Sequence, residues 1–284
     1  MKKPEPFLMQ YFRSIITPTN VFKGKNILTW PKMMILFIFI IACLMLPTSI
    51  QMAKLTSFPF EFLFPGTANL ITEDFAKALS TKEIEDGKLV GLTSEYIEAD
   101  DKDVIAIDVK DHFQLVGEDQ TVSIEGYNNA VIFKEDYAII TNENGYGFQL
   151  FYPTNKEKYP FNIESKEDVM QYLGSIWYQQ NKALLLPILL SLIAFLYIAL
   201  NVLQYVFMSL VLWLTKKSNI THINTFKEAS NIVMNAAGLP TILAVLYGFI
   251  QFDVATLIMI QSIGTVLMIA FAFFKTGFKE HGYK

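Results

Sequence analysis

The feature that most constrains this chain is a run without any charged residue from Leu184 to Leu214, which ends just before Lys216 and Lys217. A hydrocarbon core of about 30 Å needs roughly 20 apolar residues in a helix that rises about 1.5 Å per residue. The run is longer than this, and lipid offers the backbone no hydrogen-bond partners, so it has to be helical. The sequence therefore predicts a transmembrane helix at residues 183–215, which separates two compartments.

Three further apolar stretches are long enough to span a membrane, at residues 33–53, 232–250 and 254–274. The link between the last two, residues 251–253, is so short that these helices have to form an antiparallel hairpin. With 52% hydrophobic and 18% charged residues, the chain is too apolar for a soluble domain and too charged to lie wholly in lipid. We therefore predict a multi-pass α-helical membrane protein with four transmembrane helices and a separate polar domain.

Charge is distributed unevenly along the chain. Between Lys54 and Lys182 lie 11 basic and 23 acidic residues, a net charge of −12, whereas the other 12 basic residues precede the first span or follow the second and fourth. Cytoplasmic loops of membrane proteins are rich in Lys and Arg. The pattern therefore predicts that both termini, the loop 216–231 and the tail 275–284 are cytoplasmic, and that the acidic block lies outside the cell membrane.

Residues 1–32 form a basic leader with interspersed aromatic and aliphatic residues. Pro18 and Gly24 interrupt the apolar pattern, and the strong apolar run begins only at Met33, so a signal peptide does not fit. We expect a cytoplasmic segment with an amphipathic helix on the membrane surface and Trp30 at headgroup depth. A disordered basic leader is the alternative.

The acidic block, residues 54–182, is long enough to be a domain with its own core. A helix is predicted at Thr72–Glu85, and Ser165 with Asp168 resembles a capping box that begins a helix leading into the second span. Between them, turn residues separate six β-type runs, of which we expect the last four to form an antiparallel β-meander. We therefore predict an inserted extracytoplasmic α+β domain. The six runs are Leu89–Leu92, Val104–Val109, Thr121–Ile124, Ala130–Phe133, Tyr137–Thr141 and Phe148–Tyr152.

The sequence contains no motif that predicts catalysis or cofactor binding. A phosphate-binding glycine loop, a zinc-protease helix and a nucleophile elbow are all absent. The single cysteine, Cys43, and three scattered histidines argue against a Cys/His metal site. We therefore predict no catalytic residues, no cofactor and no metal.

Two acidic features of the outer block have ordinary structural explanations. Asp101 and Asp103 lie in the densest acidic cluster, but the residues that follow lack the oxygen ligand and glycine of a calcium loop, so we interpret the cluster as a solvated turn. His112 follows Asp111, and no motif places a serine or cysteine nucleophile with them. We interpret them as a surface pair.

Inside the predicted spans there is no Asp, Glu, Lys, Arg or His, the residues that usually mark proton and ion pathways. Asn201 and Gln204 share one face of the second span near its middle, and Gln261 with Ser262 occupies the middle of the fourth. Such amides usually hydrogen-bond across helices, so helix packing is the favoured interpretation. A polar substrate path is the alternative.

Several aromatic residues lie on or beside the predicted meander. An aromatic sheet face is able to stack on sugar rings, but alternate strand positions have to be buried on one face, so we favour core positions over a recognition surface. The candidate recognition aromatics are Tyr127, Tyr137, Tyr146, Phe148 and Tyr152.

The chain resembles a bacterial membrane-protein family known as domain of unknown function 1189. The resemblance rests on the leader sequence SIITPTNVF, on the acidic outer domain, and on FKEASNIVMNAAGLPTIL, in which Phe226, Ala229 and the pair Leu239-Pro240 match the family's entry into the third span. It implies no catalytic residues. Some members are labelled maltodextrin-utilisation proteins, which implies an association with sugar uptake.

Three functional hypotheses remain. The favoured one is a non-enzymatic accessory or regulatory membrane protein whose outer domain recognises a partner, alongside sugar uptake. The second is a small transporter or channel subunit with a path along Asn201, Gln204 and Gln261, and the third is a membrane-bound enzyme acting on lipid or glycan. Uncharged spans count against the second and missing motifs against the third. The favoured hypothesis predicts the lipid bilayer and another membrane protein, such as a sugar-uptake system, as partners, and no nucleic acid.

Overall fold

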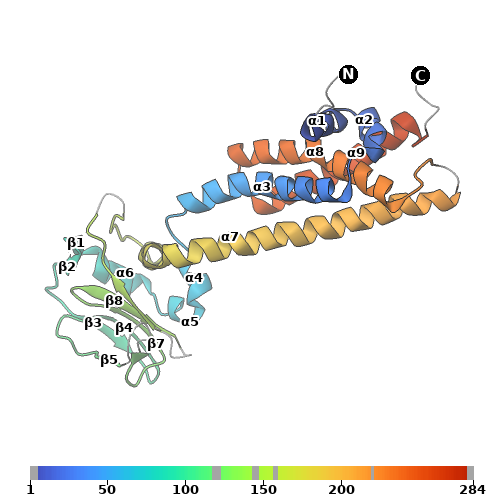
Figure 1. The fold of residues 1–284 in the computed structure, drawn as a ribbon. Coiled ribbons are helices and arrows are strands. Elements are labelled where there is room, and N and C mark those ends of the chain that lie inside the picture. Colours follow the sequence, from blue (N-terminus) through green and yellow to red (C-terminus); the bar gives the residue numbers. More distant parts are fainter. Residues whose placement is uncertain (1–5, 117–122, 143–146, 156–158, 219–220, 280–284) are drawn as a thin grey trace. The chain divides into compact units, whose positions relative to one another are not determined.

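The computed structural model describes residues 6–116, 123–142, 147–155, 159–218 and 221–279 (Figure 1). Contacts divide the chain into two compact units. The helical unit comprises Met1–Lys54 and Leu186–Lys284, and the sheet unit comprises Leu55–Leu185.

Within the described ranges, four helices are long and apolar enough to cross a membrane, and they contain the four apolar runs of the sequence. The second continues without a break through Pro187 and begins well before the apolar run, as the capping box at its start predicts. Its first residues belong to the sheet unit and the rest to the helical unit. The four helices are α3 (Trp30–Lys54), α7 (Lys166–Leu214), α8 (Phe226–Ile250) and α9 (Val254–Thr276).

Short polar signals delimit these helices. Thr225 caps α8 by accepting a hydrogen bond from the Glu228 amide, and Asp253 caps α9 by accepting one from the Thr256 amide. Gly277 ends α9 with φ 55°, in the left-handed region that favours glycine. The hairpin predicted between the third and fourth spans therefore turns through residues that are suited to helix ends.

The leader forms two short helices, α1 (Phe7–Ile16) and α2 (Pro18–Lys23), and a 3₁₀ turn, η1 (Gly24–Asn26). The buried side of α1 includes Tyr11 and Ile15, which belong to the same core as α8 and α9. The other side of α1 leaves several large apolar residues exposed. The leader is thus amphipathic, and its buried face packs on other helices of its own unit.

The sheet unit is built on a five-stranded sheet in the order β3-β4-β7-β8-β9, with two separate hairpins, β1-β2 and β5-β6. All neighbours are antiparallel except β4 and β7, which run parallel with Ile105 beside Val131. The strands are β1 (Glu83–Glu85), β2 (Lys88–Val90), β3 (Tyr96–Ala99), β4 (Asp103–Ile107), β5 (Leu115–Val116), β6 (Ser123–Ile124), β7 (Asn129–Phe133), β8 (Tyr137–Thr141) and β9 (Gly147–Phe151).

Both faces of this sheet are buried, because its central strands carry runs of consecutive apolar residues, such as Val104–Ile107 and Ala130–Phe133. One face, which includes Val131 and Phe133, packs against helices α4 (Phe60–Leu63), α5 (Pro65–Ala68) and α6 (Glu73–Ser80) and the start of α7 (Figure 1). The other face, which includes Ala130 and Ile132, is covered by Phe113, Leu115, Ile124 and Tyr127. A strand buried on both faces reads as a continuous apolar run, as β7 does.

Two predictions for the sheet unit are wrong in part. The meander has three strands, β7 to β9. The first of the four predicted runs, Thr121–Ile124, contributes β6, which pairs with β5 in a separate hairpin. The predicted helix Thr72–Glu85 ends at Ser80, and Ile84 instead lies opposite Leu89 in the β1-β2 hairpin. The turn between these strands is Asp86-Gly87, with φ 48° and 79°, and Asp-Gly is a strong hairpin signal.

Candidate functional site

The predicted intramembrane amides meet at the interface of α7 and α9. Gln261 is fully buried, and its Nε2 lies within hydrogen-bonding distance of Asn201 Oδ1 (2.5 Å) and the Tyr205 hydroxyl (3.2 Å). Gln204 Nε2 donates to the Ser262 carbonyl (3.2 Å), and the Ser262 hydroxyl donates back to Gln204 Oε1 (3.0 Å). The structure therefore brings all four predicted residues together as two neighbouring pairs.

The Gln261 pair extends into a longer buried polar chain. Asn201 Nδ2 donates to the Tyr197 carbonyl (2.9 Å), and the Tyr197 hydroxyl shares a hydrogen bond with Thr48 of α3 (3.1 Å). Among the described residues, Gln261 Oε1 is buried and has no hydrogen-bond partner. This hydrogen-bond network links α3, α7 and α9, and it leaves the Gln261 Oε1 acceptor unsatisfied.

A second polar network, which the sequence reasoning missed, joins the leader to α8. Asn231 accepts from the Leu28 amide (2.8 Å) and donates to the Leu28 carbonyl (3.2 Å). The Ser14 hydroxyl donates to Asn235 Oδ1 (2.9 Å). The sequence signal was the pair Asn231 and Asn235, one helical turn apart at the start of an apolar run. Both side chains are fully buried, and buried amides need hydrogen-bond partners.

An apolar cavity of about 410 Å³ lies in the helical unit between α3, α7 and α8. Its lining includes Met33, Phe37, Val202, Tyr205 and Phe226. Ser209 and Ser230 are among its few polar residues. A cavity of this composition suits hydrocarbon and offers little to a sugar.

The four candidate recognition aromatics that the structure describes do not share one exposed face. Tyr152 is 5% exposed, and its hydroxyl donates to the Lys134 carbonyl, while Phe148 packs against Trp177. Tyr127 contacts Phe113 in the core on the opposite face of the sheet. Tyr137 is half-buried and lies against Phe151, which is 56% exposed on the edge strand β9. Tyr146 lies outside the described residues.

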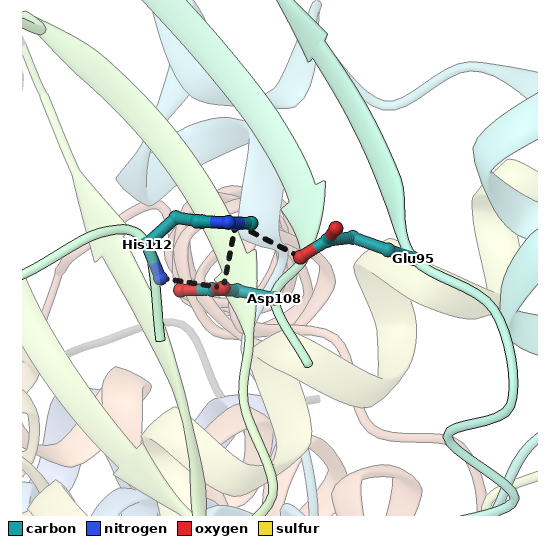
Figure 2. Close-up of side chains that lie close together, drawn as sticks. All are labelled: Glu95, Asp108 and His112. Atoms are coloured by element: carbon teal, nitrogen blue, oxygen red, sulfur yellow. Dashed lines mark hydrogen bonds and ion pairs between the residues drawn. The ribbon is translucent and has the colours of Figure 1, made fainter. Parts of the chain in front are cut away.

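A cluster of two carboxylates and a histidine, which sequence reasoning did not find, lies in the sheet unit (Figure 2). Tyr96 of β3 pairs with Ile107 of β4, so Glu95 just before β3 and Asp108 just after β4 come to the same end of the sheet. The turn after β4 then brings His112 back over Asp108, whose Oδ1 accepts a hydrogen bond from the His112 amide (2.9 Å). The sequence did not reveal the register of the β3-β4 pair, which brings Glu95 and Asp108 to the same end of the sheet.

The side-chain nitrogen and oxygen atoms of this cluster lie close together. His112 Nδ1 is 2.9 Å from Glu95 Oε1 and 3.7 Å from Asp108 Oδ1 (Figure 2). The side chain of Asp108 is fully buried, whereas that of His112 is 47% exposed. The predicted surface pair of His112 with Asp111 is therefore wrong, because the turn directs His112 toward Glu95 and Asp108 while Asp111 contacts Lys134.

Lys134, which directly follows β7, neutralises part of the negative charge of the carboxylates. Its ammonium donates to Asp111 and to the Phe113 carbonyl, and it lies 3.5 Å from Asp108 Oδ2. Burial lowers the pKa of Lys134, but the hydrogen bond to Asp111 and the charges of both aspartates outweigh this effect and raise that pKa above its usual value. Lys134 is therefore a permanent cation beside the cluster.

The predicted acidic cluster is a turn. Asp100 Oδ1 accepts hydrogen bonds from the Lys102 and Asp103 amides, both 2.8 Å. These bonds lower the pKa of Asp100. Asp103 Oδ1 in turn accepts a hydrogen bond from the Asn129 side chain. The carboxylates of this cluster thus organise the backbone before β4.

Comparison with known proteins identifies the family. The family described as protein of unknown function (DUF1189) matches residues 12–273. A Bacillus subtilis (strain 168) protein named maltodextrin utilization protein YvdJ is 31% identical over 268 residues, which cover 94% of this chain and 89% of that protein. Maltodextrose utilization protein MalA of Streptococcus pneumoniae (strain ATCC BAA-255 / R6) is 25% identical over 278 residues, 98% of each chain. No solved structure matches. Because the match runs from the leader through the last apolar helix, the chain belongs to the DUF1189 family.

Proposed function

We propose that this protein is a non-enzymatic accessory or regulatory membrane protein of maltodextrin uptake, and that its sheet unit is a recognition surface outside the membrane. The observation that carries the proposal is the similarity to two proteins named for maltodextrin or maltodextrose utilization, which extends over 94% and 98% of this chain. Because the similarity spans both units, the proposed role belongs to the whole chain and not to one segment.

The polar groups of the helical unit support an accessory role. Asn201, Gln204 and Ser262 hydrogen-bond within the bundle, as packing residues do. The segment between α7 and α8 is far too short to form a signalling domain. A signal or a sugar-dependent effect would therefore pass to a partner membrane protein, such as a component of a sugar-uptake system.

The part of the sheet unit best suited to recognition is the aromatic pair Tyr137 and Phe151. Their ring centroids are 6.1 Å apart, and the exposed Phe151 lies on β9, an edge strand of the sheet. An exposed aromatic ring offers a flat apolar face beside polar groups, which suits a sugar ring. The other described candidate aromatics are occupied by core packing.

A growth experiment tests this proposal. Deleting the gene should slow growth on maltodextrin and leave growth on glucose unchanged. The full-length protein should restore growth, and the Phe151→Ala and Tyr137→Ala variants should restore it less. Ile97→Ala is the matched control, because Ile97 is also exposed, at 45%, but lies on the opposite edge strand β3. Unchanged growth of the deletion strain on maltodextrin would contradict the proposal.

One observation favours a transporter subunit as the second candidate. Gln261 Oε1 is buried in the centre of the bundle without a partner among the described residues, which is the kind of acceptor that a polar substrate uses. Full-length protein in liposomes would then take up labelled maltotriose, and Gln261→Leu would abolish uptake. Absence of uptake by well-incorporated protein would remove this candidate.

A further inference from the structure

We propose that Glu95, Asp108 and His112 form a binding site for a divalent transition-metal ion, with Zn²⁺ as the best fit. The site lies in the sheet unit and is separate from the aromatic pair of the proposed function. Each residue offers one ligand atom, and the three atoms all lie within 4.8 Å of one another. The proposal rests on the spacing of these atoms, the surroundings of the carboxylates and the type of donors.

The spacing fits a tetrahedral ion. Zn²⁺ binds nitrogen and carboxylate oxygen at about 2.0–2.2 Å, so two ligand atoms of a tetrahedral site are separated by roughly 3.3–3.6 Å. The His112 Nδ1 distances to Glu95 Oε1 and Asp108 Oδ1, 2.9 and 3.7 Å, lie on either side of this range. Shifts of a few tenths of an ångström would therefore bring His112 Nδ1 to the separation from each carboxylate oxygen that a shared ion requires.

Glu95 Oε1 is an acceptor without a donor. It is buried and has no hydrogen-bond partner among the described residues, and its contact with His112 Nδ1, at 2.9 Å, does not have hydrogen-bond geometry. A buried carboxylate oxygen without a donor loses its hydration and gains nothing in return. A metal ion between Glu95 and His112 would supply the missing partner for Glu95 Oε1.

The remaining carboxylate oxygens are held by groups outside the cluster. Lys110 Nζ lies 3.3 Å from Glu95 Oε2, and the Phe113 amide donates to Asp108 Oδ2 (3.0 Å). Such contacts fix the orientation of metal-binding carboxylates, and they leave Glu95 Oε1 and Asp108 Oδ1 directed at the same point. The three carboxylates of Glu95, Asp108 and Asp111 exceed the two ammonium groups of Lys110 and Lys134, so the fixed charges of these side chains favour a cation.

The donor set selects among cations. An imidazole nitrogen suits Zn²⁺ and other transition metals, whereas Mg²⁺ prefers oxygen ligands. Ca²⁺ needs six to eight oxygen ligands, far more than the two carboxylates supply. Three protein ligands would leave one position of a tetrahedral Zn²⁺ open, and the 47% exposure of His112 gives water access to it.

The test uses full-length protein in detergent, prepared without a polyhistidine tag and treated with EDTA. Titration calorimetry with ZnCl₂ should give one site per chain. Zn²⁺ should raise the melting temperature, because an ion that binds only the folded state stabilises it, and Mg²⁺ should not. His112→Gln and Glu95→Gln should each weaken Zn²⁺ binding at least tenfold.

Two control variants remove the same kinds of side chain elsewhere. His222→Gln and Asp101→Asn should bind Zn²⁺ with the affinity of the unchanged protein. Melting without metal shows whether each variant is folded. If Glu95→Gln fails to fold, His112→Gln still tests the proposal, because the His112 side chain is half-exposed and its replacement should leave the fold intact. The absence of a Zn²⁺ site in the unchanged protein, or equal affinity in folded His112→Gln, would overturn the proposal. Neither result would bear on growth with maltodextrin.

Discussion

Several buried amide side chains in this protein hydrogen-bond to a polar group on another segment. Gln204 and Ser262 exchange two hydrogen bonds between α7 and α9, and Asn231 of α8 makes two to Leu28. In an apolar surrounding an unpaired amide is costly, so each pair favours one particular alignment of its two segments. These residues specify packing and need no catalytic role to explain them.

Replacing the side-chain amide of Gln204 tests the packing role of the Gln204–Ser262 pair. Gln204→Leu should lower the stability of the protein in detergent by about 0.5–1 kcal/mol, because each interhelical hydrogen bond contributes on this order. A double-mutant cycle with Ser262→Ala should give a coupling free energy of similar size in thermal unfolding. Strictly additive effects of the two substitutions would contradict a direct bond.

The capping box at the start of α7 predicts a pH effect. Hydrogen bonds from the Ser165 side chain, then from the Glu164 and Ser165 amides, lower the pKa of Asp168. A carboxyl group with a lowered pKa stabilises the folded state above its unfolded pKa of about 3.9 and loses this effect as pH falls through the folded value. Asp168→Asn should therefore make the melting temperature fall less between pH 5 and pH 3.

The neighbouring Glu167→Gln is the control for this effect, since Glu167 is exposed and lies outside the capping box. Ser165→Ala should independently cost about 1 kcal/mol, as loss of a helix N-cap does. An acid response of Asp168→Asn identical to that of the unchanged protein would contradict the role of the carboxylate.

At the scale of elements, α1 and α2 act as part of the helical core. Tyr11 and Ile15 of α1 face α8, where Gly238 leaves room for them. A Cβ atom at position 238 would lie 2.5 Å from Ile15 Cγ2 and 2.8 Å from the Tyr11 hydroxyl. The Tyr11 hydroxyl also donates to the Met234 carbonyl (3.2 Å). Close approach of the two helices therefore depends on this glycine.

A larger side chain at Gly238 should displace α1. Gly238→Val should destabilise the protein by about 1–3 kcal/mol, because overpacking a close contact forces neighbouring side chains to shift. Trypsin should then cleave after Arg13 or Lys23 faster than in the unchanged protein. Leu246→Ala is the control, since Leu246 is 55% exposed on the same helix. Equal cleavage rates for Gly238→Val and the control would contradict the proposed contact.

At the scale of the whole molecule, two units with separate cores share one continuous helix, α7. The helical unit is built from long helices of nearly uniform apolar composition, and the sheet unit buries both faces of a mixed sheet. The single cysteine, Cys43, lies in α3, so the sheet unit has no disulfide. Its stability therefore comes from apolar burial.

The sheet unit should fold without the long apolar helices of the helical unit. A fragment of residues 55–185 retains the two cores of this unit, so it should melt cooperatively. Circular dichroism during heating measures this. A fragment with Phe133→Ala, which empties a fully buried position of the core, should melt at a clearly lower temperature. A non-cooperative transition in the unaltered fragment would contradict independent folding.

The orientation predicted from charge is testable in intact cells. In a Cys43→Ala background, a cysteine at Asp101 should react with a membrane-impermeant thiol reagent, whereas cysteines at Lys217 or Lys279 should not, because basic segments remain in the cytoplasm. All three positions are exposed, so labelling after cell lysis should be equal. Labelling of Lys217→Cys in unbroken cells would reverse the orientation.

Local composition determined the four apolar helices, the capping box at Ser165 and the presence of a separate sheet region. The reason is physical, since a long uncharged apolar run has only one conformation that satisfies its backbone in lipid. The Asp86-Gly87 hairpin was also a local signal, but helical spacing up to Ile84 obscured it. The hydrogen bonds of Asn201 and Gln204 to α9 were also predictable, because all these polar residues lie near the middle of their apolar runs.

Only the tertiary structure decided which distant residues meet. Pairing β4 with β7 in parallel joins residues about 26 positions apart, and no local pattern encodes that register. The same holds for Glu95, Asp108 and His112, which meet because β3 and β4 pair in one particular register and the following turn folds back. The leader likewise found its partners in α8, more than 200 residues away. Long-range contacts are chosen by the packing of the complete core, and so they emerge only when the whole chain is folded.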